Sequence, residues 1–302
     1  MAKINFGVHL GFAVNRWPQP DDWARLLSEE LGLKHAQFCS DLLQPNFPEE
    51  VIDEQVGRIN ESCNEFGIEI LHTFTSQRWM YSGHPDKEIS DYWLWWLQRF
   101  SEISADIGAV STGSRLGIYS VNDFEKRKDL IFNRIIDNWL KWAEYSKKAG
   151  LDCLTFEHMS IPRELAETIT ETRRILDVFK RKDPAIPILL CLDTDQGNAH
   201  SGNPKDGDPY EWIRAFGREA PVLQLKQRIR GNVSSGKPFT SEFNKDGIIA
   251  PDKVLEAIDS SGAREMTLYM EPSFRERLPH DNNVIRDLKE SVNFWKDVVD
   301  LG

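Results

Sequence analysis

Short apolar runs alternate with amphipathic stretches along the whole of this chain. The apolar runs are typical of buried strands, whereas the stretch with Ile52, Val56 and Ile59 repeats apolar residues every three or four positions, as a helix with one buried face does. We predict strands near residues 3–10, 35–40, 68–75, 109–115, 151–158, 186–193, 222–227 and 265–271. We predict helices near residues 21–32, 49–67, 89–108, 121–149, 163–182, 210–217, 251–261 and 282–300.

Eight strands that each precede a helix predict an α/β fold, the (β/α)8 TIM barrel, as a single domain over residues 1–302. The competing architecture is a doubly wound open sheet. It would need a glycine-rich nucleotide-binding turn after its first strand, which the segment 7–12 does not supply. Glycines also support the repeat, because five of them stand where a helix is expected to end in left-handed backbone just before a strand. These are Gly32, Gly67, Gly108, Gly150 and Gly262.

The composition argues against several classes of function. The formal net charge is -11, from 48 acidic and 37 basic residues, which disfavours broad contact with nucleic acid or with an anionic membrane surface. No segment approaches the roughly 18 apolar residues of a spanning helix, and the N-terminus has no signal-peptide core, so we expect a soluble, cytoplasmic protein. The four cysteines share no close spacing, so neither a disulfide framework nor a zinc module is indicated.

Oxygen-bearing side chains stand at or near the ends of four predicted strands in the C-terminal half of the chain. Burying a carboxylate is costly, and the carboxyl ends of barrel strands meet at one rim. Glu157 or Glu271 alone could cap the following helix or pair with a lysine. All four together favour a metal site in which two carboxylates also move protons. The residues are Glu157, Asp193, Gln224 and Glu271.

Other polar residues are expected at the same rim. Arg115, Lys226 and Arg230 lie at or just past strand ends, so they are cationic candidates for substrate oxygens or a phosphate, with surface ion pairing as the alternative. His9 and His72 lie within strands, where each either reaches the rim or packs as a hydrogen-bonded interior residue.

Two long segments, 75–87 and 228–250, are expected to form binding loops at the rim. The first carries Arg78, Trp79, Tyr81 and His84. In the helix that follows it, Trp93, Trp96, Leu97 and Phe100 share one face and are expected in the core. Tyr92 and Trp95 lie to another side, which suggests a subunit contact in a homo-oligomer.

At the four strand ends the chain resembles the xylose isomerase-like TIM-barrel superfamily, whose ketose 3-epimerases bind one divalent metal ion through Glu, Asp, His and Glu. The family's aspartate begins an Asp-Thr segment, matched here by Asp193 and Thr194. Its last glutamate is often followed by proline, as Glu271 is, and an arginine lies six residues beyond its third ligand, as Arg230 lies beyond Gln224. The segments 6–17 and 40–45 look most like the sugar-phosphate epimerases of tetritol (erythritol) catabolism, which act on erythrulose phosphate.

The resemblance implies a metal-dependent isomerase that inverts C3 of a 2-keto sugar, in particular a small ketose phosphate. Glu157 and Glu271 would be the two catalytic groups, one removing the C3 proton and the other returning one, while Asp193 and Gln224 chiefly hold the metal. Contacts to the substrate are expected from Arg230, Lys226, Arg115, Gln196, His72 and His9.

This chain departs from the family at two histidines, since Gln224 and Gln196 stand where the family usually has them. A site made only of oxygen ligands suits Mn²⁺ or Mg²⁺ better than Zn²⁺. Two other enzyme activities remain as alternatives, an aldose-ketose isomerase and a metal-dependent polyol dehydratase. A non-catalytic sugar-binding protein is a third alternative. The DNA-repair endonucleases of this barrel need many histidines and a basic groove, which the acidic chain does not offer.

Overall fold

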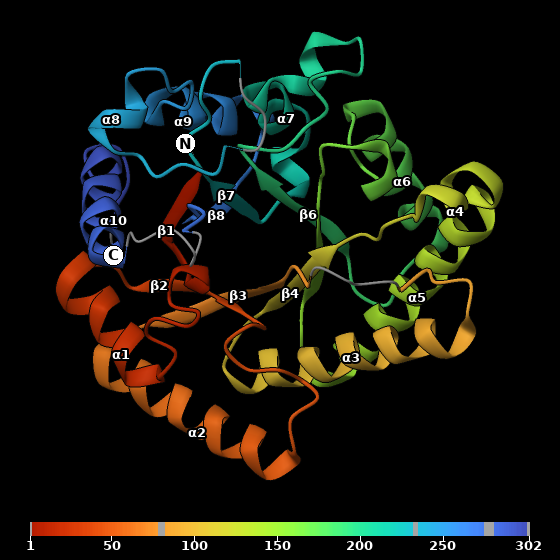
Figure 1. Ribbon diagram of the computed structural model, residues 1–302, viewed down its shortest axis with the longest axis horizontal. Helices are drawn as coiled ribbons and strands as arrows, with labels where there is room; N and C mark the ends of the chain where they lie inside the picture. The colour runs from red at the N-terminus through yellow and green to blue at the C-terminus, as the bar shows by residue number, and fades with distance from the viewer. Residues whose placement is uncertain (1, 78–81, 232–234, 275–280, 301–302) are drawn as a thin grey trace.

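The computed structural model describes residues 2–77, 82–231, 235–274 and 281–300. Eight parallel strands follow one another in sequence order and close into a barrel, because β1 pairs with both β2 and β8. The predicted TIM barrel is therefore confirmed (Figure 1). The strands are β1 (Lys3–His9), β2 (His35–Cys39), β3 (Glu69–Thr75), β4 (Ser111–Arg115), β5 (Cys153–Glu157), β6 (Ile188–Asp193), β7 (Val222–Leu225) and β8 (Glu265–Met270).

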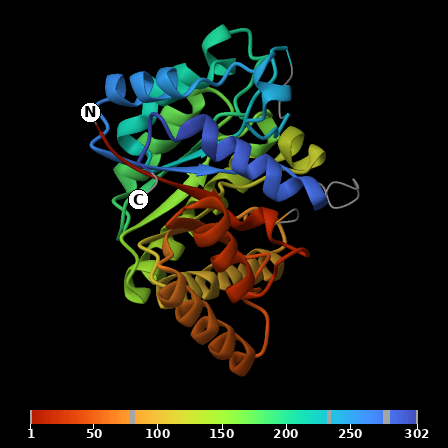
Figure 2. The same ribbon diagram turned by 90° about the vertical axis from the view of Figure 1, so that its left-hand side faces the viewer.

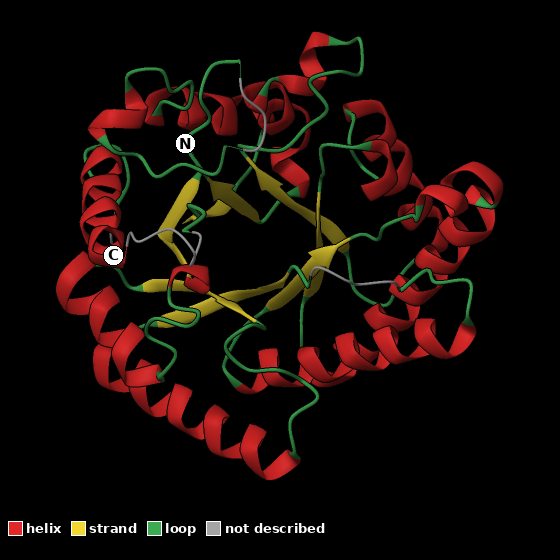
Figure 3. Ribbon diagram, viewed as in Figure 1, coloured by secondary structure: helices red, strands yellow, loops and turns green. Residues whose placement is uncertain are grey.

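Helices surround the barrel as an outer ring (Figure 3). They are α1 (Pro20–Arg25), α2 (Glu49–Phe66), α3 (Lys87–Asp106), α4 (Val121–Lys126), α5 (Lys128–Ala149), α6 (Ile169–Lys182), α7 (Pro209–Phe216), α8 (Ser241–Asn244), α9 (Pro251–Ser261) and α10 (Asp281–Trp295). A π-helical turn, Leu26–Leu31, continues α1. The last helix, α10, contacts this turn, so the two ends of the ring meet (Figures 1 and 2).

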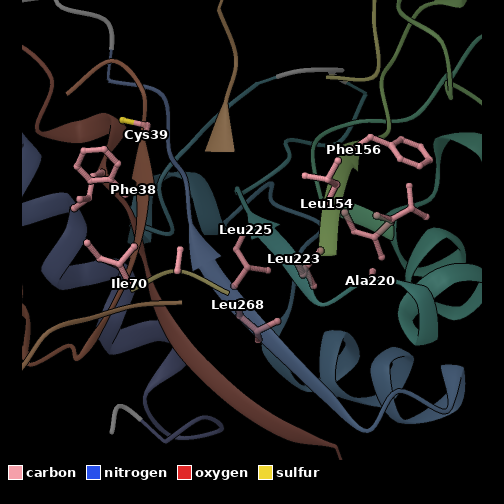
Figure 4. Packing of buried hydrophobic residues seen from close by; sticks show 14 of the residues in the cluster. Phe38, Cys39, Ile70, Leu154, Phe156, Ala220, Leu223, Leu225 and Leu268 are labelled. Atoms are coloured by element: carbon pink, nitrogen blue, oxygen red, sulfur yellow. The ribbon is translucent and has the colours of Figure 1, made fainter. Parts of the chain in front are cut away.

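Side chains alternate between the two faces of each strand, and the two faces differ in character. Outward residues such as Leu154 and Phe156 on β5 and Leu223 and Leu225 on β7 join the main core between strands and helices (Figure 4). Inside the barrel a small separate apolar cluster forms from Phe74, Cys191, Val222 and Tyr269. Burial of the outward face fixes the register, and the register sets which residues reach the rim.

The predicted glycine ends are confirmed, since all five glycines have positive φ, from 64° at Gly32 to 100° at Gly150. Two predicted helices differ from the structure. The one near 121–149 is divided into α4 and α5 at Arg127, whose ψ of 35° leaves the helical region. The one near 163–182 begins only at Ile169, after Leu165 and Ala166 adopt left-handed backbone.

The long segment after β7 carries more structure than its sequence suggests. It contains α8, and the backbone of Gln227 pairs with that of Lys237. The buried Gln227 amide donates to Asn244 and to the Ile249 carbonyl, and accepts from the Ile249 amide. These bonds hold the segment against the barrel.

The aromatic stripe of α3 has the two faces that the sequence predicts. Trp93, Trp96, Leu97 and Phe100 are buried, whereas Tyr92 and Trp95 are 46% and 43% exposed. None of the helices that the structure describes is both long enough and apolar enough to cross a bilayer.

Candidate functional site

The carboxyl ends of β6, β7 and β8 bring two acids and a lysine into direct contact. Asp193 is the last residue of β6, Lys226 follows β7, and Glu271 follows β8. The Lys226 Nζ lies 2.5 Å from Asp193 Oδ2 and 2.8 Å from Glu271 Oε2. The Lys226 side chain is only 12% exposed and that of Asp193 is fully buried. These three residues, the ion cluster, lie at the rim where the sequence predicts a metal site.

The charges of the ion cluster stabilise one another. Burial alone would lower the pKa of Lys226, but the charges of Asp193, Glu271 and Glu157 outweigh it and raise that pKa well above its usual value. Burial alone would raise the pKa of Asp193, yet the Lys226 charge and the hydrogen bonds to the carboxylate lower it. One of these bonds comes from the Asp195 amide, 2.8 Å from Asp193 Oδ1. At neutral pH Lys226 is therefore a cation that its acidic neighbours hold in place.

Glu157, the last residue of β5, lies beside the ion cluster and is 4% exposed. Burial raises the pKa of Glu157 well above its usual value, and the neighbouring charge of Asp193 adds to the rise. A hydrogen bond joins the two side chains and lowers the pKa of Asp193. The rim therefore holds a buried carboxyl on β5 whose pKa is raised and an ion-paired carboxyl after β8.

Thr194 fixes the backbone of Lys226. The Thr194 Oγ1 donates to the Lys226 carbonyl and accepts from the Lys226 amide, at 2.8 Å in both cases. The Thr194 amide in turn donates to the Gln224 carbonyl at 3.0 Å. These bonds extend the pairing of β6 with β7 past the strand ends, so Lys226 keeps the inward direction that alternation along β7 gives it.

Gln224 lies one level deeper on the same face of β7. It is fully buried, and its Nε2 donates to Gln37 Oε1 of β2 at 3.0 Å. Its Oε1 has no hydrogen-bond partner within the described part of the chain. The amide therefore contacts a neutral residue across the barrel, whereas the predicted metal site would have used its oxygen beside Asp193 and Glu271.

The side chains in place do not match the donor set expected for a metal. The Lys226 ammonium lies between the oxygens of Asp193 and Glu271 that a metal would use. Over residues 2–77, 82–231, 235–274 and 281–300, no three His, Cys, Asp or Glu side chains are arranged to hold a metal ion. Two buried oxygens among the predicted ligands, Gln224 Oε1 and Glu271 Oε2, have no hydrogen-bond partner within the described part of the chain, although Glu271 Oε2 is ion-paired with Lys226.

The two predicted histidines lie at different depths. His9 ends β1, and its Nδ1 accepts from the Gly11 amide at 3.0 Å, so the neutral ring carries its proton on Nε2. Burial lowers the pKa of His9, against the charge of Glu271. His72 lies deeper in β3, where its Nδ1 is 2.7 Å from Ser111 Oγ. Burial lowers the pKa of His72 to about 4. Its contact with a substrate stays a prediction.

The remaining predicted residues lie around the ion cluster. Arg115 ends β4 in register with Glu157, and its Nη1 is 3.8 Å from Glu164. Gln196 follows β6, and its Oε1 accepts from Ser160 Oγ at 2.5 Å. Arg230 is exposed on the segment after β7. The contact of Arg115, Gln196 and Arg230 with a substrate stays a prediction.

Two buried charged residues at this rim were missed by the sequence analysis. Asp195 accepts a hydrogen bond from the Gly236 amide at 2.6 Å, and burial together with Asp193 raises the pKa of Asp195 to about 6. Arg228 is 5% exposed and donates to the Gln196 carbonyl at 3.4 Å. Asp195 lies two residues past Asp193, and Arg228 lies two residues past Lys226. An alternation of inward-facing residues that continues beyond the strand ends would therefore have indicated both of them.

The predicted binding loop 75–87 is described only at its two ends, residues 75–77 and 82–87. Arg78, Trp79 and Tyr81 lie outside the described residues. His84 is described, and its Nδ1 accepts from the Asp86 amide at 3.0 Å.

Comparisons with known proteins agree with the barrel fold. No family model matches the chain. A D-erythrulose 1-phosphate 3-epimerase from Brucella abortus (strain 2308) is 33% identical over 293 residues, which are 96% of this chain and 94% of that protein.

Solved structures share the fold over nearly the whole chain. A provisionally named xylose isomerase from Rhodospirillum rubrum superposes with a TM-score of 0.88 at 23% identity, covering 98% of this chain and all of that one. A D-psicose 3-epimerase from Clostridium cellulolyticum H10, solved with D-tagatose, gives 0.70 at 15% identity, covering 98% and 99%. At such identities the structures show the fold alone.

Proposed function

The chain belongs to the family of the D-erythrulose 1-phosphate 3-epimerase and is an enzyme of the isomerase class, and from this membership we propose that it inverts C3 of a small ketose phosphate such as erythrulose phosphate. The observation that carries the proposal is the pair of acids at the barrel rim. Glu157 is a buried carboxyl on β5 whose pKa is raised by burial, and Glu271 is a carboxyl after β8 that is ion-paired with Lys226.

Inversion at C3 needs two proton-transfer groups, one that is deprotonated and one that carries a proton. A carboxylate removes the C3 proton, which the neighbouring C2 carbonyl makes weakly acidic, and a protonated carboxyl adds a proton from the other face. We assign Glu271 as the base and Glu157 as the acid in one direction, with the roles exchanged in the reverse direction. The strand that ends in Glu157 and the strand that Glu271 follows are separated by β6 and β7.

The substrate's oxygens and phosphate require donors at the same rim. We assign this role to Arg115, Gln196, His9 and Arg230. Arg115 supports the assignment best, because its Nε is buried with no hydrogen-bond partner within the described part of the chain. A bound phosphate or hydroxyl would satisfy it.

The negative charge that develops on the C2 oxygen must be met by a cation. The expected Mn²⁺ or Mg²⁺ ion stays a prediction, which the unpartnered Gln224 Oε1 supports. Lys226 is the second candidate for that cation, and its contacts with Asp193 and Glu271 support it.

Solvent exchange tests the proposed reaction. We expect the protein to convert a ketose 1-phosphate into its C3 epimer in D2O and to place deuterium at C3, as followed by NMR. Glu157→Gln and Glu271→Gln should each lower kcat by about 10²–10⁴-fold, the range for a lost acid or base. Glu265→Gln is the matched control, because Glu265 begins the strand that Glu271 follows and pairs with Lys3 at 2.7 Å at the other end.

The position of the deuterium separates this reaction from its nearest alternative. Deuterium at C1 or C2 with an aldose product would identify an aldose-ketose isomerase. Retained C3 exchange in both the Glu157→Gln and Glu271→Gln variants, with folded protein by circular dichroism, would remove these residues from the proposal.

A further inference from the structure

We propose that Lys226 is the resident cation of this site, that its ammonium stabilises the enediolate oxygen, and that the enzyme needs no divalent metal for the reaction. The proposal rests on the proposed epimerase function and deepens it. It assigns to a side chain the place at the barrel rim where the sequence resemblance expects a metal ion.

The first argument is that the lysine and a metal would compete for the same oxygens. Lys226 Nζ is 2.5 Å from Asp193 Oδ2 and 2.8 Å from Glu271 Oε2. A Mg²⁺ ion bound to these oxygens would lie about 2.0–2.1 Å from each, within the volume that Nζ fills. Two cations so close would also repel each other strongly in a buried site. The two arrangements therefore exclude one another.

The second argument is the anchoring of the lysine. Its backbone is held at both the amide and the carbonyl by Thr194 Oγ1. Its side chain is 12% exposed, and below it on β7 the Gln224 amide is bonded to Gln37. A metal could enter only if Lys226 left two ion pairs and moved outward, which would leave a buried charge to be satisfied elsewhere.

The third argument is the number of donors. A lysine ammonium has three N–H bonds. Lys226 donates one to Asp193 Oδ2, and its contact with Glu271 Oε2 at 2.8 Å is an ion pair without a hydrogen bond. Within the described part of the chain, donor capacity therefore remains for an oxygen that lies between Glu157 and Glu271. An ammonium at this position has fixed anionic partners, so it needs little reorganisation when charge appears on the substrate, which is the property of an effective oxyanion site.

The reaction then balances without any further group. Glu271 takes the C3 proton, the C–H electron pair becomes the C2–C3 double bond, and the C2 carbonyl π pair moves to the oxygen. The Lys226 N–H donates to this oxygen and keeps its proton. Glu157 adds its proton to C3 from the opposite face as the C2 carbonyl re-forms. One carboxyl has lost a proton and the other has gained one.

Metal binding is the first test, and it needs no substrate. Wild-type protein stripped with a chelator should leave the electron paramagnetic resonance signal of micromolar Mn²⁺ unchanged. A signal lost in proportion to protein, at one Mn²⁺ per chain, would overturn the proposal even if no substrate were found. Absence of C3 exchange with any ketose phosphate would instead defeat the proposed function.

Substitution of the lysine is the second test. Lys226→Met should lower kcat by about 10²–10³-fold, the loss seen when one oxyanion donor is removed, with a smaller change in KM. Ethylammonium should restore part of the activity of Lys226→Ala. The control Lys3→Met, which removes the lysine paired with Glu265 at 2.7 Å, should keep wild-type activity. Full activity in folded Lys226→Met or Lys226→Ala, or restoration by Mn²⁺ but not by ethylammonium, would contradict the proposal.

Lys226→Arg, which keeps the charge, should retain more activity than Lys226→Met. The opposite order of activities would also contradict the proposal.

Discussion

Two inward-facing residues, Gln224 of β7 and Lys226 just past the end of that strand, are only one pleat apart and lie in different electrostatic surroundings. Gln224 is fully buried and bonded to a neutral partner, Gln37. Lys226 is charged and contacts two carboxylates. The difference arises from depth, because a charge inside the barrel would lose its hydration without compensation, whereas the rim offers counter-ions and partial access to water.

The layer of inward-facing residues that contains Gln224, which we call the deep level, is neutral at other strands too. His72 of β3 is paired in register with Gln37 of β2, and burial lowers the pKa of His72 to about 4. This level of polar but uncharged residues supports the charged level above it. The comparison suggests that chemistry belongs to the upper level and stability to the lower one.

Removing each residue of the pair in turn is the strongest way to break this comparison. Lys226→Met should lower kcat/KM by about 10²–10³-fold, whereas Gln224→Met should change it by only about fivefold or less, equivalent to roughly 1 kcal/mol. Steady-state kinetics on both variants checks the contrast. Equal losses would mean that the two levels share the chemistry.

Acid should destabilise the deep level through His72. The folded pKa of about 4 lies below the unfolded value of 6.5, so between these values the unfolded chain binds more protons. The contribution is fully present above pH 6.5 and is lost as the pH falls towards 4, by about 3 kcal/mol in total. Urea unfolding of wild type and His72→Gln across this range should show a steeper fall in the wild type. Parallel curves would mean that His72 is not held neutral.

The Gln224–Gln37 bond should contribute to stability with little effect on activity. Gln224→Leu leaves the Gln37 oxygen buried without its donor and should lower the free energy of unfolding by about 1–3 kcal/mol. The double variant with Gln37→Leu should recover part of that loss, because both polar groups are then gone. Urea titrations of the two single variants and the double variant measure the coupling.

An effect on both stability and activity is expected at Thr194, which links the two levels. Thr194→Val removes the hydroxyl that bonds the Lys226 amide and carbonyl, at a cost of about 1–3 kcal/mol in unfolding free energy. Because Lys226 would lose its fixed direction, kcat should fall severalfold, while the fold is retained. An unchanged kcat would show that the ion pairs alone position the lysine.

The barrel was predictable from the sequence because burial of strands and helices leaves periodic patterns. The depth of a side chain inside the barrel leaves no such pattern. The alternation of side chains along a strand indicates that Gln224 and Lys226 share a face. Only the register of β7 with β6 and β8 shows that the lysine is level with Glu271. The alternative that Glu157 or Glu271 alone pairs with a lysine describes Glu271 as it lies, and Asp193 pairs with the same lysine.

Some local features were beyond the sequence for similar reasons. The break at Arg127 between α4 and α5 interrupts a stretch whose apolar spacing continues. The order of the segment after β7 depends on one buried amide, Gln227, which bonds residues 17 and 22 positions away. Contacts over such separations depend on the completed fold and are not visible in local spacing.

One measurement tests the account most directly: the rate of deuterium incorporation at C3 of a ketose phosphate by chelator-stripped wild-type protein, before and after Mn²⁺ is added. Because Lys226 already supplies the cation between Asp193 and Glu271, we predict that the stripped protein exchanges C3 at the full rate and that Mn²⁺ does not raise it. Loss of exchange on stripping, with recovery in proportion to added Mn²⁺, would contradict the account.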